Sequence, residues 1–264
     1  MKILYFDKSC RVCKVSTKIV SASGISTKAN FKPLQQIDIK EMCSIDAARY
    51  CNELAVLDTQ SKEVKYGISG ILWYLEDKWG KWLSIFLFPP IFQLLNFLYL
   101  IFSYNRRMIA PVYEKLDKDC QPNFHWGFRL SYIFLAGIFS LFSSYWLGNA
   151  LKGYFDSALS YVLLVVVGWI LHSLFIQIYS VKEKMEYYGH LTTVVLSGTL
   201  VQIPFLLLFG FWPNNYMLLF SIVLSDIFML YAHYKRVKYL QISQWVTVSW
   251  WITIHLSALY HKTT

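Results

Sequence analysis

The apolar residues of this 264-residue chain are unevenly distributed, and this feature most constrains its fold. A helix needs about 20 mostly apolar residues to cross the hydrocarbon core of a bilayer. Five stretches of this kind alternate with short polar breaks, at about residues 128–148, 157–179, 191–212, 214–234 and 243–260. We therefore expect a soluble α/β domain over residues 1–81 and an all-α polytopic membrane domain of about five transmembrane helices over residues 128–264.

The segment 82–127 joins these two expected domains. Its part 82–103 is apolar enough to span a bilayer, but Pro89 and Pro90 break a helix near its middle. The sequence favours an apolar helical hairpin here, either as two short helices on the membrane surface or as a re-entrant hairpin. A polar connector follows up to residue 127.

The net charge of +9 is dispersed over the chain and forms no long basic run, which argues against a nucleic-acid partner. Basic residues concentrate before the first, after the second and after the fourth expected span. The positive-inside rule then places the N-terminal domain in the cytoplasm and the C-terminus outside, with the lipid bilayer as a partner. The chain opens without a signal peptide, because Asp7 and Lys8 interrupt its first apolar run. A bacterial inner membrane and reduced cysteines, without structural disulfides, fit this orientation.

The N-terminal domain shows the element order βαβαββα. A strand over 2–6 precedes a helix from Cys10 to about residue 22, with Ser9 as its N-cap and Gly24 after its end. A strand at 29–34 and a helix at 37–51, capped by Asp38 or Asp46, follow. A hairpin over 53–67 and a helix over 68–80 complete a minimal thioredoxin-like layout.

Cys10 and Cys13 form a CxxC pair at the first strand-to-helix turn. Unpaired N–H groups at a helix N-terminus favour an anion, which lowers the pKa of a cysteine there. We expect Cys10 to attack a disulfide and Cys13, one helical turn on, to resolve the mixed disulfide. This chemistry needs no cofactor beyond the cysteine pair.

The cysteine pair has three other interpretations. A structural zinc site usually needs a second ligand pair, and residues 1–81 contain no histidine. Haem attachment needs histidine directly after the second cysteine, where Lys14 stands. Two inert buried cysteines remain an alternative.

These residues resemble the DCC-type thiol–disulfide oxidoreductases, a family named for its DxxCxxC motif. Here the motif reads Asp7-Lys8-Ser9-Cys10-Arg11-Val12-Cys13 after a strand ending in "LYF". Lys8 stands where the family usually has glycine. The "LAVLD…EVKYG" hairpin and the Tyr104-Asn105-Arg106 segment are also similar, so the resemblance ends near residue 110. It implies a thioredoxin-like fold and protein-disulfide reductase activity on a disulfide-containing protein or a small thiol substrate.

Asp7 has two open interpretations: a general base that tunes or deprotonates the thiols, or a residue that ends the strand and caps the turn. The other cysteines, Cys43, Cys51 and Cys120, are interpreted as core or incidental residues, although Cys120 could relay electrons from the pair.

The expected spans contain few ionisable residues. Asp226, His172 and His255 are the candidates for a membrane site, because charge inside a bilayer is costly. Asp226 pairing with either histidine would give a proton path or quinone site, and two histidines could ligate haem. The alternative is a hydrogen-bonded pair that holds helices together.

The sequence thus predicts a membrane-anchored thiol–disulfide oxidoreductase. Two alternatives remain. The first is a transport or lipid-handling protein with a redox-sensing head, which requires Asp226. The second is a non-enzymatic membrane assembly factor with a docking head, which tolerates loss of Cys10.

Overall fold

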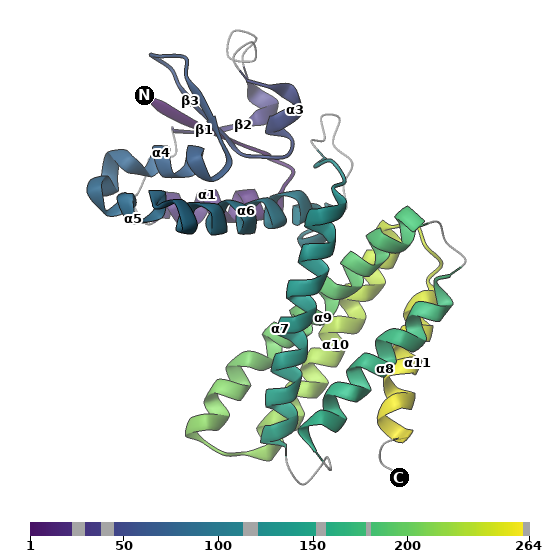
Figure 1. The fold of residues 1–264 in the computed structure, drawn as a ribbon. Coiled ribbons are helices and arrows are strands. Elements are labelled where there is room, and N and C mark those ends of the chain that lie inside the picture. The colour runs from purple at the N-terminus through teal and green to yellow at the C-terminus, as the bar shows by residue number, and fades with distance from the viewer. Residues whose placement is uncertain (23–29, 38–44, 113–120, 152–156, 178–180, 261–264) are drawn as a thin grey trace. The chain divides into compact units, whose positions relative to one another are not determined.

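The structure is a computed structural model that describes residues 1–22, 30–37, 45–112, 121–151, 157–177 and 181–260 (Figure 1). It divides into two compact units, Met1–Tyr132 and Ile133–Thr264. The first holds a mixed sheet with helices, and the second is helical. Residues 82–127, expected as a separate hairpin and connector, lie within the first unit.

The first unit contains a four-stranded sheet in the order β2-β1-β3-β4. Strand β1 (Lys2–Phe6) runs parallel to β2 (Phe31–Pro33) and antiparallel to β3 (Ala55–Asp58). Strand β4 (Val64–Tyr66) pairs antiparallel with β3, which confirms the predicted hairpin. The parallel step from β1 to β2 requires a crossover, and α1 lies in that connection.

Helices precede and follow these strands as the sequence pattern predicts. Helix α1 (Arg11–Ala22) follows β1, the 3-10 helix η2 (Leu34–Gln36) follows β2, and α4 (Gly67–Trp79) follows β4. The expected helix at 37–51 appears as α3 (Ala47–Tyr50), which Asp46 caps by accepting the Ala48 N–H. Asp38 and Gly24 lie outside the described residues.

Alternation along the strands gives the sheet an apolar core on each face. Ile3 and Tyr5 of β1 lie in one core with Leu57 of β3 and Ile45. Leu4 of β1 and Val56 of β3 point the other way and pack with Tyr74 of α4. Because side chains alternate along a strand, β1 contributes to both cores while it places the residues after Phe6 at one end of the sheet.

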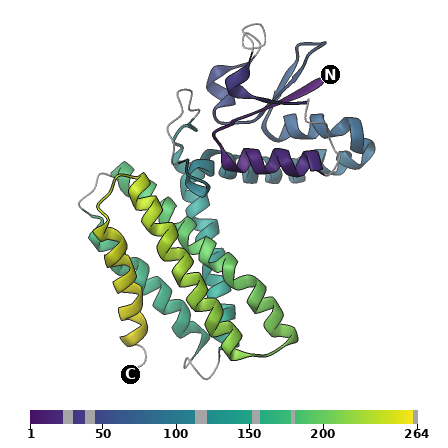
Figure 2. The ribbon, with the colours of Figure 1, turned by 180° about the vertical axis from the view of Figure 1, so that it is seen from behind.

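Three more helical elements complete the first unit: the 3-10 helix η3 (Gly80–Leu83), α5 (Ser84–Leu87) and α6 (Pro89–Ile109). The proline pair begins α6 instead of dividing a hairpin of two comparable helices, since proline fits the first helical positions. The C-terminal half of α6 buries Ile101, Asn105 and Met108 in the unit. In Figure 1 and in the reverse view of Figure 2, α6 and α1 lie on the same face of the sheet.

The second unit contains the five helices predicted after residue 127. They are α7 (Trp126–Ala150, which begins in the first unit), α8 (Ala158–Phe175), α9 (Val181–Phe211), α10 (Asn215–Tyr239) and α11 (Trp245–Tyr260). Among the described residues, three stretches are long and apolar enough to cross a membrane: Trp126–Ala150, Lys184–Phe211 and Asn215–Tyr239. This indicates an integral membrane protein.

The prediction of five transmembrane helices is therefore confirmed only in part. Helix α11 has 16 residues, fewer than the roughly 20 that a perpendicular span requires. Helix α8 has 18 residues, and its described apolar part is the shorter stretch Val165–Leu174.

Helices α9 and α10 form an antiparallel pair, and Asn214 caps α10 by accepting the N–H groups of Tyr216 and Met217. A Cβ added to Gly198 of α9 would collide with Met229 of α10, so glycine permits this close approach. The Ser225 hydroxyl donates to the Gly198 carbonyl at 3.0 Å. Close packing and an interhelical hydrogen bond thus join α9 and α10.

Candidate active site

The turn after β1 is held by Asp7. Its carboxylate accepts the Ser9 N–H at 2.9 Å and the Ser9 hydroxyl at 2.5 Å. The Cys10 N–H donates to the Asp7 carbonyl at 3.1 Å, and α1 begins one residue later. Cys10 therefore lies at the N-terminus of α1, as the sequence predicts.

Asp7 is also paired with cations, although only 2% of it is exposed. Arg107 Nη2 lies 3.2 Å and Arg106 Nη2 lies 3.7 Å from Asp7 Oδ2. The Gln35 side-chain amide donates to Oδ1 at 3.1 Å. These contacts favour the interpretation that Asp7 shapes the turn and orients neighbouring arginines, while its role as a base stays a prediction.

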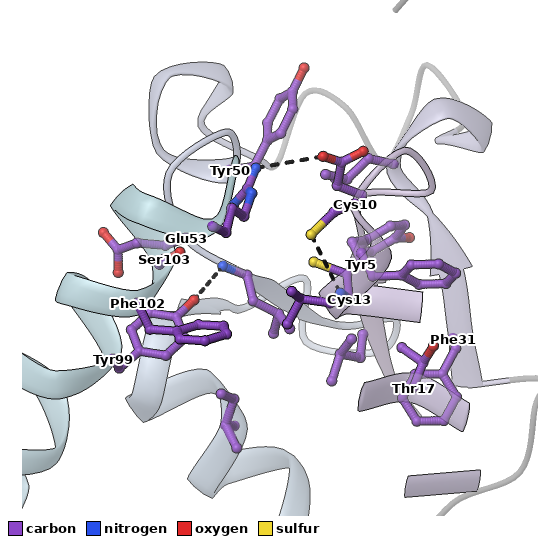
Figure 3. Close-up of a pocket in the computed structure, with 18 residues that line it drawn as sticks. Tyr5, Cys10, Cys13, Thr17, Phe31, Tyr50, Glu53, Tyr99, Phe102 and Ser103 are labelled. Carbon is purple, nitrogen blue, oxygen red and sulfur yellow. Dashed lines mark hydrogen bonds and ion pairs between the residues drawn. The ribbon is translucent and has the colours of Figure 1, made fainter. Parts of the chain in front are cut away.

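Cys10 and Cys13 are free thiols that lie together at this helix end (Figure 3). The Cys13 N–H donates to Cys10 Sγ over 3.4 Å. Only 1% of Cys10 is exposed, whereas Cys13 is half-buried.

The surroundings separate the pKa values of the two thiols. The Cys10 pKa is lowered to about 6, first by the hydrogen bond from the Cys13 thiol, then by the Cys13 N–H and the positive charge of Arg106, against the opposing effect of burial. The Cys13 pKa is raised, first by its hydrogen bond to Cys10 and then by burial. Cys10 is therefore the thiolate at neutral pH, and Cys13 holds its proton.

Arg106 and Arg107 are site residues that the sequence analysis did not single out for function. Both come from the last turn of α6, nearly 100 residues after the cysteine pair. Arg106 is anchored by donating to the Cys51 carbonyl at 2.8 Å, and Arg107 donates to the Ser9 hydroxyl at 2.7 Å. In the sequence, the Tyr104-Asn105-Arg106 segment of the family resemblance is the feature that could have indicated them.

A cavity of about 280 Å³ lies beside the thiols and includes both cysteines in its wall (Figure 3). Strand β1, helices α1, α4 and α6, and the segment around Tyr50 and Leu54 contribute its lining. A small molecule can therefore reach the sulfur atoms.

Cys51 is the third cysteine within the described residues. Cys51 is disulfide-bonded, which differs from the expectation of no structural disulfide, and its partner is neither Cys10 nor Cys13, since both are free. Cys43 and Cys120 lie outside the described residues. Within those residues, no group of three or more His, Cys, Asp and Glu side chains could hold a metal ion.

In the second unit, the structure gives His172 a hydrogen-bond partner that the sequence did not predict. His172 Nε2 lies 2.5 Å from the Tyr187 hydroxyl, which lies 2.7 Å from His233 Nε2. Asp226 is half-buried on α10, and the side chain of His255 is outside the described part of the chain. Tyr187 is therefore a described partner of His172 and links it to His233, while a pairing of Asp226 with either His172 or His255 stays a prediction.

A mixed four-stranded sheet with a free cysteine pair after its first strand defines an α/β thiol domain. Residues 4–110 match the family model of the DCC1-like thiol-disulfide oxidoreductases, so the resemblance to that family is confirmed for this part of the chain. The match indicates a redox function with thiol or disulfide substrates. The comparisons with curated proteins and with solved structures give no match.

Proposed function

We propose that the chain is a membrane-anchored thiol–disulfide oxidoreductase, with a thioredoxin-like domain whose active dithiol is Cys10 and Cys13. The observation that carries this proposal is the hydrogen-bonded Cys10 sulfur beside Arg106, with a pKa lowered to about 6. A thiolate at neutral pH is the reactive form in disulfide exchange.

The proposed reaction has two exchange steps. The Cys10 thiolate attacks one sulfur of the substrate disulfide, which forms a mixed disulfide and expels the other sulfur as a thiolate. The Cys13 thiolate then attacks Cys10 Sγ, closes the Cys10–Cys13 disulfide and expels the second substrate thiolate. Both thiolates take up protons, so the dithiol loses two electrons and two protons to the substrate.

The structure supplies a physical reason for the order of these steps. Two causes of the raised Cys13 pKa are its hydrogen bond to Cys10 and the Cys10 charge. Both disappear when Cys10 enters the mixed disulfide, because its sulfur is then uncharged. Cys13 becomes easier to deprotonate at the stage when it must attack.

Trapping the mixed disulfide tests this proposal. The full chain in detergent micelles is reduced, exposed to glutathione disulfide and analysed by peptide mass spectrometry. Cys13→Ser should accumulate glutathione on Cys10, whereas the wild type should end with a Cys10–Cys13 disulfide. Glutathione bound elsewhere, or no adduct at either cysteine, would contradict the assignment.

Membrane placement belongs to the same proposal. The three long apolar stretches anchor the chain, and the basic residues before the first, after the second and after the fourth expected span favour a cytoplasmic N-terminal domain in a bacterial inner membrane. Helices α5 and α6 and Phe88 between them expose apolar side chains, including Leu87 and Leu94, which favours contact with the membrane surface. Protease digestion of an N-terminal tag in sealed vesicles of known orientation tests the side, since a cytoplasmic tag is cleaved only in inverted vesicles.

A further inference from the structure

The cavity beside the thiols has a mostly apolar wall. Its lining includes Leu4, Phe6, Val12, Phe31, Leu54 and Ile71, besides the charged side chains of Asp7, Glu53 and Arg106. Figure 3 shows Phe31 close to Thr17 in the wall of this cavity. Apolar walls with a few polar groups are typical of sites that bind small molecules.

The burial of Cys10 makes this cavity the route to the nucleophile. Cys10 is 1% exposed and lines the cavity, so a substrate sulfur must enter the cavity to meet Cys10 Sγ. A charged or strongly hydrated group loses its water shell on entering such a wall, whereas an apolar group gains by leaving water. Apolar substrate groups are therefore expected to enter the cavity more readily than charged ones.

Backbone groups at the cavity wall are already used within the unit. The Leu54 N–H donates to the Tyr99 hydroxyl at 2.8 Å, and the Leu54 carbonyl accepts the Gly67 N–H at 2.9 Å. An extended peptide docks on a strand by using such groups. Their occupation favours a compact small molecule over a peptide strand at this wall.

An apolar surface leads to the cavity along α6. Leu94, Leu98 and Phe102 are exposed and lie four residues apart, so they share one face of the helix. Phe102 also lines the cavity, while 43% of it remains exposed. Apolar molecules held on this face thus reach the rim of the site.

We propose that the cavity is a substrate subsite for the apolar group of a small, uncharged disulfide, such as an aryl or alkyl disulfide. This inference rests on the proposed disulfide exchange and names its substrate class. The Cys10 thiolate attacks one sulfur of R–S–S–R while R fills the cavity, and R–S⁻ leaves and takes up a proton. Cys13 then closes the Cys10–Cys13 disulfide and releases the second R–SH, so two electrons pass to the substrate.

The test compares two disulfides on the reduced full chain in the same micelles: uncharged diphenyl disulfide and charged glutathione disulfide. Ile71→Trp fills the cavity with a larger side chain. The matched control is Val15→Trp, at a position on α1 that is 55% exposed and outside the cavity wall. The measured quantity is the single-turnover rate with diphenyl disulfide divided by the rate with glutathione disulfide.

We expect Ile71→Trp to lower this ratio by about tenfold or more, as for the loss of an apolar binding group, and Val15→Trp to leave it unchanged. An unchanged ratio in Ile71→Trp overturns the subsite. Biphenyl, which has no sulfur, gives a test without mutation: it should slow the wild-type reaction with diphenyl disulfide in a saturable way, and no slowing also overturns the subsite. If the proposed function itself is wrong, the result is different, because then neither diphenyl disulfide nor glutathione disulfide oxidises Cys10.

Discussion

Two buried polar clusters, one in each unit, are built on opposite principles. In Met1–Tyr132, the carboxylate of Asp7 is compensated by Arg106 and Arg107, and the thiols beside them line a cavity. In Ile133–Thr264, uncharged groups are hydrogen-bonded end to end from His172 through Tyr187 to His233. The first cluster leaves a nucleophile beside a cavity, whereas the second links its side chains to one another by hydrogen bonds.

The second cluster also joins elements that are distant in sequence. It continues from His233 Nδ1 to the Thr247 hydroxyl at 3.0 Å, and Trp250 stacks on the His233 ring with a centroid distance of 4.7 Å. Its four hydrogen-bonded members, called here the histidine–tyrosine chain, are His172 on α8, Tyr187 on α9, His233 on α10 and Thr247 on α11. The comparison shows that a buried histidine can hold helices together through hydrogen bonds. A reactive site instead needs a side chain with a shifted pKa that lies next to a cavity.

The largest expected effect is loss of the nucleophile. Cys10→Ser should lower the rate of disulfide reduction by at least about 1,000-fold, because a serine hydroxyl is not ionised at neutral pH. Thiol release from glutathione disulfide, measured with the full chain, checks this. The histidine–tyrosine chain provides the contrast: Tyr187→Phe should retain the wild-type rate. Full activity in Cys10→Ser would instead support a non-enzymatic role of the N-terminal domain.

The next largest effect is on stability, and here Tyr187→Phe is the variant that we expect to change. Tyr187→Phe removes the hydroxyl that links His172 and His233, which leaves two buried ring nitrogens without that partner. We expect the free energy of unfolding to fall by about 2–3 kcal/mol. Unfolding in mixed micelles of mild and denaturing detergent, followed by circular dichroism, measures it. A Tyr187→Phe protein as stable as the wild type would show that the chain does not hold the helices together.

A smaller effect is expected from the charge beside the thiols. In the wild type, the rate of alkylation of Cys10 should rise with pH through about 6 and level off above it, because the thiolate is then fully formed. Arg106→Gln removes a positive charge that lowers the Cys10 pKa, so the midpoint should move up by about one unit. Arg106→Lys keeps the positive charge and should move the midpoint of the alkylation rate less. Midpoints that coincide in wild type and Arg106→Gln would exclude Arg106 as a cause.

Sequence alone predicts the parts of this molecule that depend on local pattern. The apolar run of β1, the polar turn at Asp7 and the helical spacing after Cys10 are adjacent, so the cysteine position follows from them. The hairpin β3–β4 is equally local. The ion pairs of Arg106 and Arg107 with Asp7 were not predicted, because they join residues about 100 positions apart and depend on how α6 packs.

The buried polar residues of the second unit also show that sequence alone does not predict contacts between distant helices. His172 stands out in the sequence because it interrupts an apolar stretch, and the sequence suggests Asp226 as a partner of either His172 or His255. Tyr187 and His233 lie in the more polar turns of α9 and α10, near charged residues such as Lys184 and Lys235. Their polarity resembles that of ordinary helix ends, so only the packing of the helices identifies them as buried partners.

The smallest expected effect comes from the end of the histidine–tyrosine chain. Thr247→Val keeps the shape of the side chain but removes its hydrogen bond to His233 Nδ1. We expect a loss of about 1 kcal/mol in the free energy of unfolding. Disulfide reduction by Cys10 should be unchanged, which gives a control within the same protein.

Combining Thr247→Val with Tyr187→Phe shows whether the chain acts as a unit. A neutral His233 donates from one ring nitrogen and accepts at the other, so its bond to Thr247 fixes the direction of its bond to Tyr187. Once Tyr187→Phe removes that constraint, Thr247→Val should change the free energy of unfolding by a different amount than it does in the wild type. The double variant should therefore depart from additivity by at least about 0.5 kcal/mol. The unfolding measurement on all four proteins gives this coupling energy. Strict additivity would mean that the four groups are separate contacts and do not act as one hydrogen-bonded unit.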